Sequence, residues 1–139
     1  MSIFSIDCET IGLYGETFAV GVCVIDSEGK EIETLFLRAD HNLAKGTPSS
    51  KKWIEENVIP TLYPINCETL KELRDKFWNF YMNCKLKYPG IIFMADCGVP
   101  VESSFFKDCI MDDLENRMWE GPFPLHENGT LLLLCGKNP

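Results

Sequence analysis

The chain has 139 residues, of which 45% are hydrophobic and 24% are charged, and its formal net charge is −8. These values are typical of one globular domain and exclude a disordered or low-complexity chain. The negative charge argues against tight, sequence-independent binding of nucleic acid, because such binding depends on Lys and Arg. It does not exclude a nuclease, because acidic metal ligands and a local basic strip are compatible with a negative total.

The cysteines and the hydropathy of the sequence indicate the cellular compartment of the protein. The seven cysteines include no Cys-x-x-Cys pair, so neither a zinc site nor a disulfide framework is indicated. No apolar run approaches the roughly 18–20 residues of a membrane span, and the amino terminus lacks the basic flank of a signal peptide. We therefore expect a cytoplasmic protein, intracellular and reducing in environment, with free thiols and no membrane partner.

The first strand is expected over residues 2–9, where Ile3, Phe4 and Ile6 are good strand formers. Side chains of a strand alternate between faces, so Asp7 and Glu9 share one face at its carboxyl end. Two neighbouring carboxylates repel each other, and burial makes each harder to ionise. A bound divalent cation removes that cost, because Mg²⁺ prefers carboxylate oxygens.

The Asp-x-Glu spacing alone is weak evidence for a metal site. It also occurs as Asp26-Ser27-Glu28, where we expect a turn, and as Asp113-Leu114-Glu115, where we expect a solvated helix face. The position at the end of a strand distinguishes the first copy, because sheet proteins tend to place ligands there.

Two further strands complete an opening unit of three antiparallel strands. Residues 17–25 form the second, in which large residues alternate with small ones, Ala19, Gly21 and Cys23. The small residues predict that a helix packs closely against their face. A turn over residues 26–30, with Gly29 free to adopt a positive φ, leads to a third strand over residues 31–38.

Two helices follow. The first is expected from Pro48 to about Val58 and carries Lys51 and Lys52 beside Trp53. These three side chains fit either a solvated face with a partly buried indole or contact with a phosphate backbone and a base. The second, over residues 67–87, has an apolar stripe about five turns long that predicts packing on the sheet.

The remaining segments bring a second set of acids. Residues 91–95 are a continuous apolar run, typical of a strand buried on both faces in parallel pairing, and the run ends at Asp96. A helix begins near Val101 with Glu102 in its first turn, and a last helix is expected over residues 131–135. If the fourth strand lies parallel to the first, Asp7, Glu9, Asp96 and Glu102 converge on one pair of cations. Two metals roughly 3.5–4 Å apart are a known solution to phosphodiester hydrolysis.

Two segments of the sequence resemble motifs of a known family. Residues 6–12, Ile-Asp-Cys-Glu-Thr-Ile-Gly, and the block 92–106 are similar to the first two motifs of the DEDD superfamily of 3′–5′ exonucleases. The resemblance implies an α/β, ribonuclease H-like mixed sheet, with three antiparallel strands and then a parallel one, flanked by helices. It also implies two Mg²⁺ or Mn²⁺ ions, held by Asp7, Glu9 and either Asp96 or Glu102, and a single-stranded nucleic acid end as substrate. Glu102 stands three residues before a Phe, as the family's acid does, whereas Asp96 lies at the strand end, and both stay candidates.

The carboxyl-terminal motif departs from the family. The family has a fourth carboxylate in a His-x4-Asp or Tyr-x3-Asp pattern, but here no Asp follows Asp113, and His126 is followed five residues later by Leu131. We interpret His126 as a surface or packing residue. Residues 1–139 are thus expected to form a single exonuclease-like domain truncated at its carboxyl end, or a full-length relative without the last part of the site.

Three functions remain open from the residues. The first is a metal-dependent 3′–5′ exonuclease-like domain acting on RNA or DNA ends. The alternative is a catalytically incompetent binding or scaffold domain of the same fold. The third is an unrelated acidic α/β protein with exposed acids at a strand end. The choice of RNA or DNA and the oligomeric state, with a homodimer among the options, also stay open.

Overall fold

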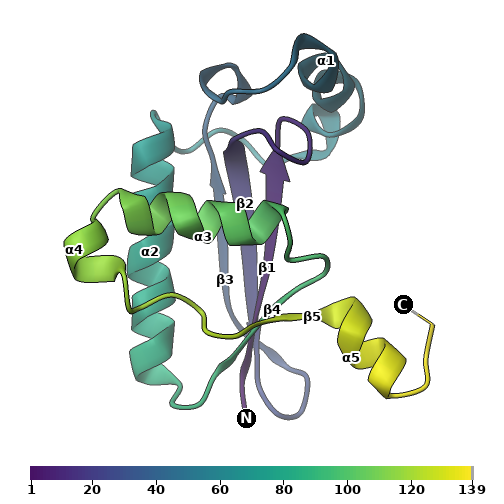
Figure 1. Ribbon diagram of the computed structural model, residues 1–139, viewed down its shortest axis with the longest axis vertical. Helices are drawn as coiled ribbons and strands as arrows, with labels where there is room; N and C mark the ends of the chain where they lie inside the picture. Colours follow the sequence, from purple (N-terminus) through teal and green to yellow (C-terminus); the bar gives the residue numbers. More distant parts are fainter. Residues whose placement is uncertain (139) are drawn as a thin grey trace.

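Five strands form one mixed sheet in the computed structural model, which describes residues 1–138 (Figure 1). The strands lie in the order β3-β2-β1-β4-β5. Their bounds are β1 Ile3–Thr10, β2 Thr17–Ile25, β3 Glu31–Arg38, β4 Ile92–Ala95 and β5 Leu125–Glu127. The first four strands agree closely with the predicted ranges. The short β5 was expected only as an extended piece, and it joins the sheet as a fifth strand.

The helices also follow the predicted order. Their bounds are α1 Pro48–Asn57, α2 Leu70–Lys87, α3 Val101–Met111, α4 Leu114–Arg117 and α5 Asn128–Leu134, with short 3-10 helices η1 His41–Leu43 and η2 Ile59–Thr61. The second predicted helix begins three residues late, because Thr69 caps it. The Thr69 hydroxyl accepts a hydrogen bond from the Glu72 amide at 3.0 Å, and the Glu72 carboxylate accepts one from the Glu68 amide at 2.7 Å.

The pairing of the strands brings the carboxyl ends of β1 and β4 together at the same end of the sheet. β1 pairs with β2, and β2 with β3, in antiparallel fashion, whereas β4 runs parallel to β1 with Ile6 opposite Ala95. β5 then runs parallel to β4. This confirms the predicted mixed sheet of three antiparallel strands followed by a parallel one.

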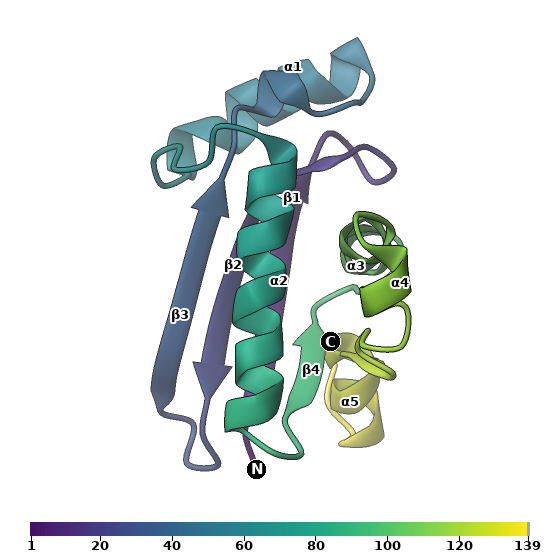
Figure 2. The same ribbon diagram turned by 90° about the vertical axis from the view of Figure 1, so that its left-hand side faces the viewer.

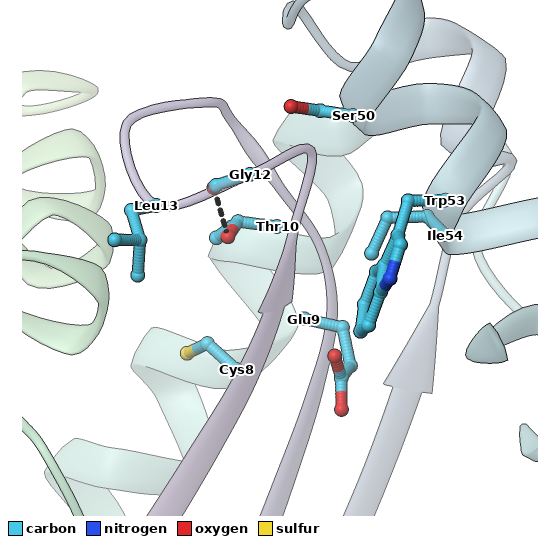
Figure 3. Close-up of a pocket in the computed structure, with 8 residues that line it drawn as sticks. All are labelled: Cys8, Glu9, Thr10, Gly12, Leu13, Ser50, Trp53 and Ile54. Carbon is cyan, nitrogen blue, oxygen red and sulfur yellow. Dashed lines mark hydrogen bonds between the residues drawn. The ribbon is translucent and has the colours of Figure 1, made fainter.

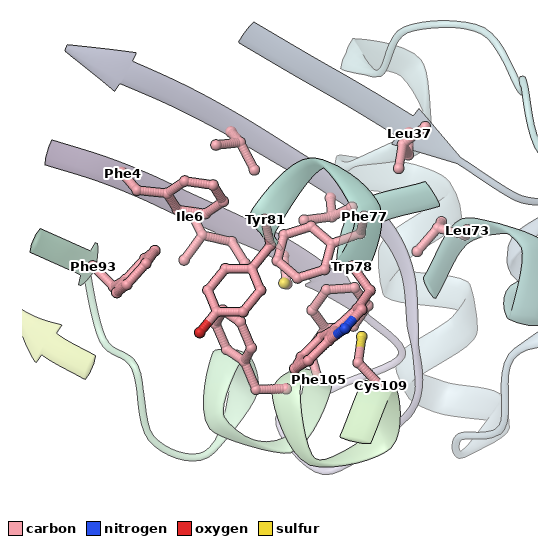
Figure 4. Close-up of a cluster of buried hydrophobic side chains, with 14 of the residues drawn as sticks. Phe4, Ile6, Leu37, Leu73, Phe77, Trp78, Tyr81, Phe93, Phe105 and Cys109 are labelled. Atoms are coloured by element: carbon pink, nitrogen blue, oxygen red, sulfur yellow. The ribbon is translucent and has the colours of Figure 1, made fainter. Parts of the chain in front are cut away.

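The core lies between the sheet and two helices, α2 and α3 (Figures 2 and 4). Phe77 of α2 contacts Phe105 of α3 with ring centroids 4.8 Å apart, and Tyr81 of α2 contacts Phe4 of β1 at 5.9 Å. All four rings are almost fully buried. Such aromatic pairs contribute about 0.5–1.5 kcal/mol each beyond the area that they bury. The stripe predicted for α2 is therefore core, as expected.

An ion pair joins the carboxyl end of α3 to α2, which α3 crosses at a large angle (Figure 1). The Arg74 guanidinium donates two hydrogen bonds to the Asp112 carboxylate, at 2.6 and 3.1 Å. Both side chains are mostly shielded from water. A bidentate pair of this kind restrains orientation as well as distance, so the helix that carries Glu102 is held in one position.

One packing prediction was confirmed only in part. The small residues of β2 were expected to face a helix, and Ala19 is buried in a cluster with Ile54 of α1. The long helix α2, however, covers the opposite face, where Val20, Val22 and Val24 are buried. The larger side chains remove more apolar area from water, so the apolar stripe of α2 is stabilised more on their face. Gly21 and Cys23 remain partly exposed on the other face of the sheet.

The described helices give no membrane span, since none has both the length and the hydropathy to cross a bilayer. All seven cysteines are free thiols, and Cys8, Cys67, Cys84 and Cys109 are buried. Free thiols in this number fit the expected reducing environment.

Candidate functional site

Two predicted acids lie side by side at one edge of the sheet. Ile6 of β1 pairs with Ala95 of β4, and in parallel strands the next residues, Asp7 and Asp96, are therefore neighbours. Loss of hydration, and then the charge of Asp96, raise the pKa of the Asp7 carboxyl. Acids from two segments far apart in the sequence thus meet, as the parallel pairing required.

Glu102 approaches the same edge from α3. Its side chain is 5% exposed, and its Oε1 accepts a hydrogen bond from the backbone amide of Cys8 at 3.0 Å. Burial raises the pKa of the Glu102 carboxyl, the Cys8 amide opposes that effect, and the charges of Asp7 and Asp96 add to it. One carboxylate oxygen is therefore committed to the backbone of β1.

Glu9 is the fourth acid. It lies two residues beyond Asp7 on the same face of β1 and is half-buried. Burial, and then the charges of Asp7 and Glu102, raise the pKa of the Glu9 carboxyl. Neighbouring carboxylates thus raise the pKa values of Asp7, Glu9 and Glu102, so in the absence of a cation this edge of the sheet carries unfavourable like-charge repulsion.

The end of β5 adds a residue that the sequence did not reveal. Asn128, the first residue of α5, lines a pocket of about 440 Å³ together with Asp7 and Asp96. β5 was not expected to join the sheet, so nothing in the sequence placed Asn128 here. His126, in contrast, lines a separate pocket with Ser103 and does not join the four acids there.

A pocket of about 310 Å³ adjoins Glu9 on the side of α1 (Figure 3). The Trp53 indole stands beside the Glu9 side chain, and Leu13 lies across the pocket. Trp53 is 58% exposed and Leu13 is 63% exposed, whereas Ile54 is buried and anchors α1. The indole is thus more exposed than the partly buried side chain of one interpretation, and its ring is free to contact a ligand.

Close packing holds the loop that carries Leu13. The Glu16 amide donates to the Lys45 carbonyl at 2.8 Å, and the Lys45 amide donates to the Glu16 carboxylate at 2.9 Å. A side chain at Gly15 would overlap the Ile11 carbonyl oxygen, so only glycine allows this approach. Leu13 is thereby presented at the mouth of the pocket by a rigid loop.

No protein-family model matches the sequence, and no curated protein sequence matches it. Solved structures match it well in shape. E. coli Exonuclease I in complex with a dA16 oligonucleotide superposes with a TM-score of 0.69 at 11% identity, over 97% of this chain and 30% of that one. The same enzyme with a dT13 oligonucleotide gives 0.68 at 12% identity, over 97% of this chain and 29% of that one.

The chain has the ribonuclease H-like fold of these exonucleases. It spans about 30% of the length of the exonuclease that it matches. The predicted fold class is therefore confirmed, and the resemblance seen in the first two motifs extends to the three-dimensional arrangement of the elements around them.

The acids of this ribonuclease H-like sheet suit a hard cation. The four carboxylates supply only oxygen donors, which Mg²⁺ and Mn²⁺ prefer, and their mutual repulsion favours a positive charge between them. Within residues 1–138, no three side chains of His, Cys, Asp or Glu stand together as a ready ligand cluster. The donors fit such an ion by chemistry and proximity, without forming a closed cage.

Proposed function

We propose that this chain is a metal-dependent 3′–5′ exonuclease-like domain that hydrolyses phosphodiester bonds at the end of a single-stranded RNA or DNA. The observation that carries the proposal is that Asp7 and Asp96 follow paired residues of two parallel strands, while Glu102 of α3 accepts a hydrogen bond from the amide of Cys8, the residue next to Asp7. The shared fold with an exonuclease solved in complex with dT13 and dA16 oligonucleotides supports it.

The metal site of the proposal comprises Asp7, Glu9, Asp96 and Glu102, with two Mg²⁺ or Mn²⁺ ions in a complete site. Bound there, such ions activate water and stabilise the leaving oxygen. The protein's own part is to hold the carboxylates in place: the Cys8 amide fixes Glu102, and the pairing of β1 with β4 fixes the neighbouring pair.

The pocket beside Glu9 is the proposed seat of the terminal base. Its volume of about 310 Å³ suits one nucleobase, and the exposed Trp53 face offers a stacking surface that accepts any base. Lys45 precedes α1, and Lys51 and Lys52 lie on it, so they are the proposed contacts to the phosphate backbone. We place this activity in the cytoplasm, where free cysteines persist.

A binding or scaffold role is the second candidate. Its specific support is the position of His126, which lines a pocket apart from the acids and is therefore unsuited to orient an attacking water. In this role the carboxylates bind a cation and the domain binds the end of a nucleic acid, but it does not hydrolyse the phosphodiester bond.

One experiment separates the readings. The chain is incubated with Mn²⁺ and single-stranded oligonucleotides of DNA and RNA labelled at the 5′ end, beside Asp7→Asn as the matched control. A ladder shortened from the 3′ end, absent in the variant, supports the exonuclease. Binding of the oligonucleotide and a Mn²⁺-dependent rise in melting temperature, with no ladder, establishes the scaffold role instead. No response to Mn²⁺ contradicts both.

A further inference from the structure

A second pocket, the Tyr14 pocket, adjoins the one assigned to the terminal base. Its volume is about 500 Å³, and it lies between the loop of residues 11–16 and the segment 45–50, which leads into α1. The two pockets share Gly12, Leu13 and Ser50, so they meet at Leu13. Only the first of them is lined by Glu9, so the Tyr14 pocket is the one further from the proposed metal site.

Exposed apolar side chains border both pockets. Trp53 lines only the first pocket, Leu13 lines both, and Tyr14 lines only the second. Leu13 and Trp53 stand on opposite sides of the first pocket (Figure 3). Tyr14 is 89% exposed, so nearly its whole ring is open to water. A path from the first pocket to the second therefore passes two aromatic rings with one aliphatic side chain between them.

Close packing against the start of α1 fixes the position of Tyr14. Gly12 has a φ of 76°, and a Cβ on it would lie 2.7 Å from the Ser50 hydroxyl oxygen. A Cβ on Gly46 would overlap the side chain of Ile11, which is buried. A ring held by so tightly packed a loop binds a ligand at a lower entropic cost, because the loop is ordered beforehand.

Lys45 is the cation of the Tyr14 pocket. Its side chain is exposed and joins no ion pair among residues 1–138. Glu16 fixes its backbone, since the Glu16 amide donates to the Lys45 carbonyl at 2.8 Å and the Glu16 carboxylate accepts the Lys45 amide at 2.9 Å. Glu16 is also the acid in the lining, so the pocket has one charge of each sign. A phosphate group is therefore repelled less here than beside the acids of the proposed metal site, and the Lys45 ammonium attracts it.

We propose that the Tyr14 pocket binds the penultimate nucleotide of the single strand, with its base stacked on Tyr14 and its 5′ phosphate beside Lys45. The inference rests on the proposed function, because it starts from a terminal base in the pocket beside Glu9. Every nucleobase offers a flat face to an aromatic ring, so this position accepts any sequence. Leu13 stands between the two bases, so the substrate has at least two unpaired nucleotides at its 3′ end.

Two ligands distinguish the two nucleotide positions. Thymidine 5′-monophosphate occupies only the terminal position, whereas a 5′-phosphorylated thymidine dinucleotide occupies both. Each ligand competes with a fluorophore-labelled dT oligonucleotide for the full chain in Ca²⁺, and fluorescence anisotropy gives its affinity.

The key variants are Tyr14→Ala, which removes the ring, and Tyr14→Phe, which keeps it. Tyr14 is exposed, so neither variant creates a cavity, and thermal unfolding confirms that both fold. Lys45→Gln is matched by Lys30→Gln, because Lys30 is also exposed, lies in the turn between β2 and β3, and its replacement changes the net charge equally. Trp53→Ala reports on the terminal position.

We expect Tyr14→Ala to weaken the dinucleotide about tenfold, as the loss of one stacked base does, and to leave the mononucleotide unchanged. Tyr14→Phe should bind both ligands as the wild type does. Lys45→Gln should weaken the dinucleotide more than Lys30→Gln does. Trp53→Ala should weaken both ligands.

Weakening of the dinucleotide by Trp53→Ala but not by Tyr14→Ala would overturn the inference and leave the proposed function standing. A loss of mononucleotide affinity in Tyr14→Ala would also overturn it, because the ring would then belong to the terminal position. Equal effects of Lys45→Gln and Lys30→Gln would overturn the phosphate contact. If neither ligand nor the oligonucleotide bound the wild type, the proposed function would be contradicted and the inference with it.

Discussion

The carboxylate of Glu102 accepts a hydrogen bond from the backbone amide of Cys8, at 3.0 Å and across 94 positions of the sequence. This bond joins the first turn of α3 to the middle of the proposed metal site, because Cys8 stands between Asp7 and Glu9. The same side chain is buried, so a strand amide, rather than water, sets its orientation. The bond links the stability of the fold to the arrangement of the acids.

Replacing Asp7 by Asn should stabilise the metal-free protein near pH 7. The pKa values of Asp7, Glu9 and Glu102 are raised, so folding favours their protonated forms. Their contribution to stability is full below the ordinary carboxyl pKa of about 4 and is lost as pH rises through the raised values. We expect a gain below about 1 kcal/mol, because water screens the exposed Asp7.

Urea unfolding of both proteins in EDTA, at pH 4 and at pH 7, measures this effect. The difference between them should be larger at pH 7, where the wild-type carboxylates are ionised. Added Mn²⁺ should raise the melting temperature of the wild type but not that of Asp7→Asn. A variant less stable than the wild type at pH 7 would contradict the like-charge repulsion on which this expectation depends.

Two substitutions of Glu102 separate its structural and electrostatic roles. Glu102→Gln keeps an oxygen that accepts the Cys8 amide, whereas Glu102→Ala leaves that buried amide without a partner. The alanine variant should lose about 1–3 kcal/mol of unfolding free energy, and the glutamine variant should lose little. Both should weaken Mn²⁺ binding in isothermal titration. Equal stability of the two variants would show that the Cys8 bond contributes nothing.

Trp53→Ala should weaken single-stranded oligonucleotide binding without weakening the fold. Loss of one stacked base corresponds to about 1–3 kcal/mol of binding free energy. The indole is 58% exposed, so its removal creates little cavity in the core. Fluorescence anisotropy with a dT oligonucleotide in Ca²⁺ measures the affinity, with Trp119→Ala as the matched exposed-tryptophan control. If the two variants behaved alike, the pocket beside Glu9 would not be the seat of the terminal base.

Gly15→Ala should destabilise the protein, because the added methyl group would overlap the Ile11 carbonyl oxygen. Overpacking of this kind costs about 1–3 kcal/mol. Gly21→Ala is the control, since a Cβ at that position makes only ordinary contact with the Phe36 ring. Thermal unfolding should show a lower melting temperature for the first variant alone. Equal melting temperatures would mean that the loop carrying Leu13 shifts to accommodate the methyl group without loss of stability.

Local sequence patterns were sufficient to predict most of the helices and strands. The β-branched and aromatic alternation of residues 17–25 fixed a strand with the bounds that the structure shows. The Thr-Pro start of α1 did the same for a helix, because the Thr47 hydroxyl accepts the Ser50 amide at 3.2 Å. β5 was missed as a strand because its three residues carry too short a pattern, and its pairing depends on the edge that β4 offers.

The sequence by itself determined the strands and helices, the apolar stripe of α2 and the two acids at the end of β1, because these follow from the periodicity of nearby residues. Only the tertiary structure decided which acids meet. Asp96 lies beside Asp7 through parallel pairing, Glu102 is fixed by the Cys8 amide, and Asn128 joins them through β5. The tertiary structure also left Gly21 and Cys23 of β2 partly exposed, whereas Ala19 on the same face is buried beside α1. Contacts between distant segments depend on strand register and on which face buries the larger apolar area, and a local sequence pattern predicts neither.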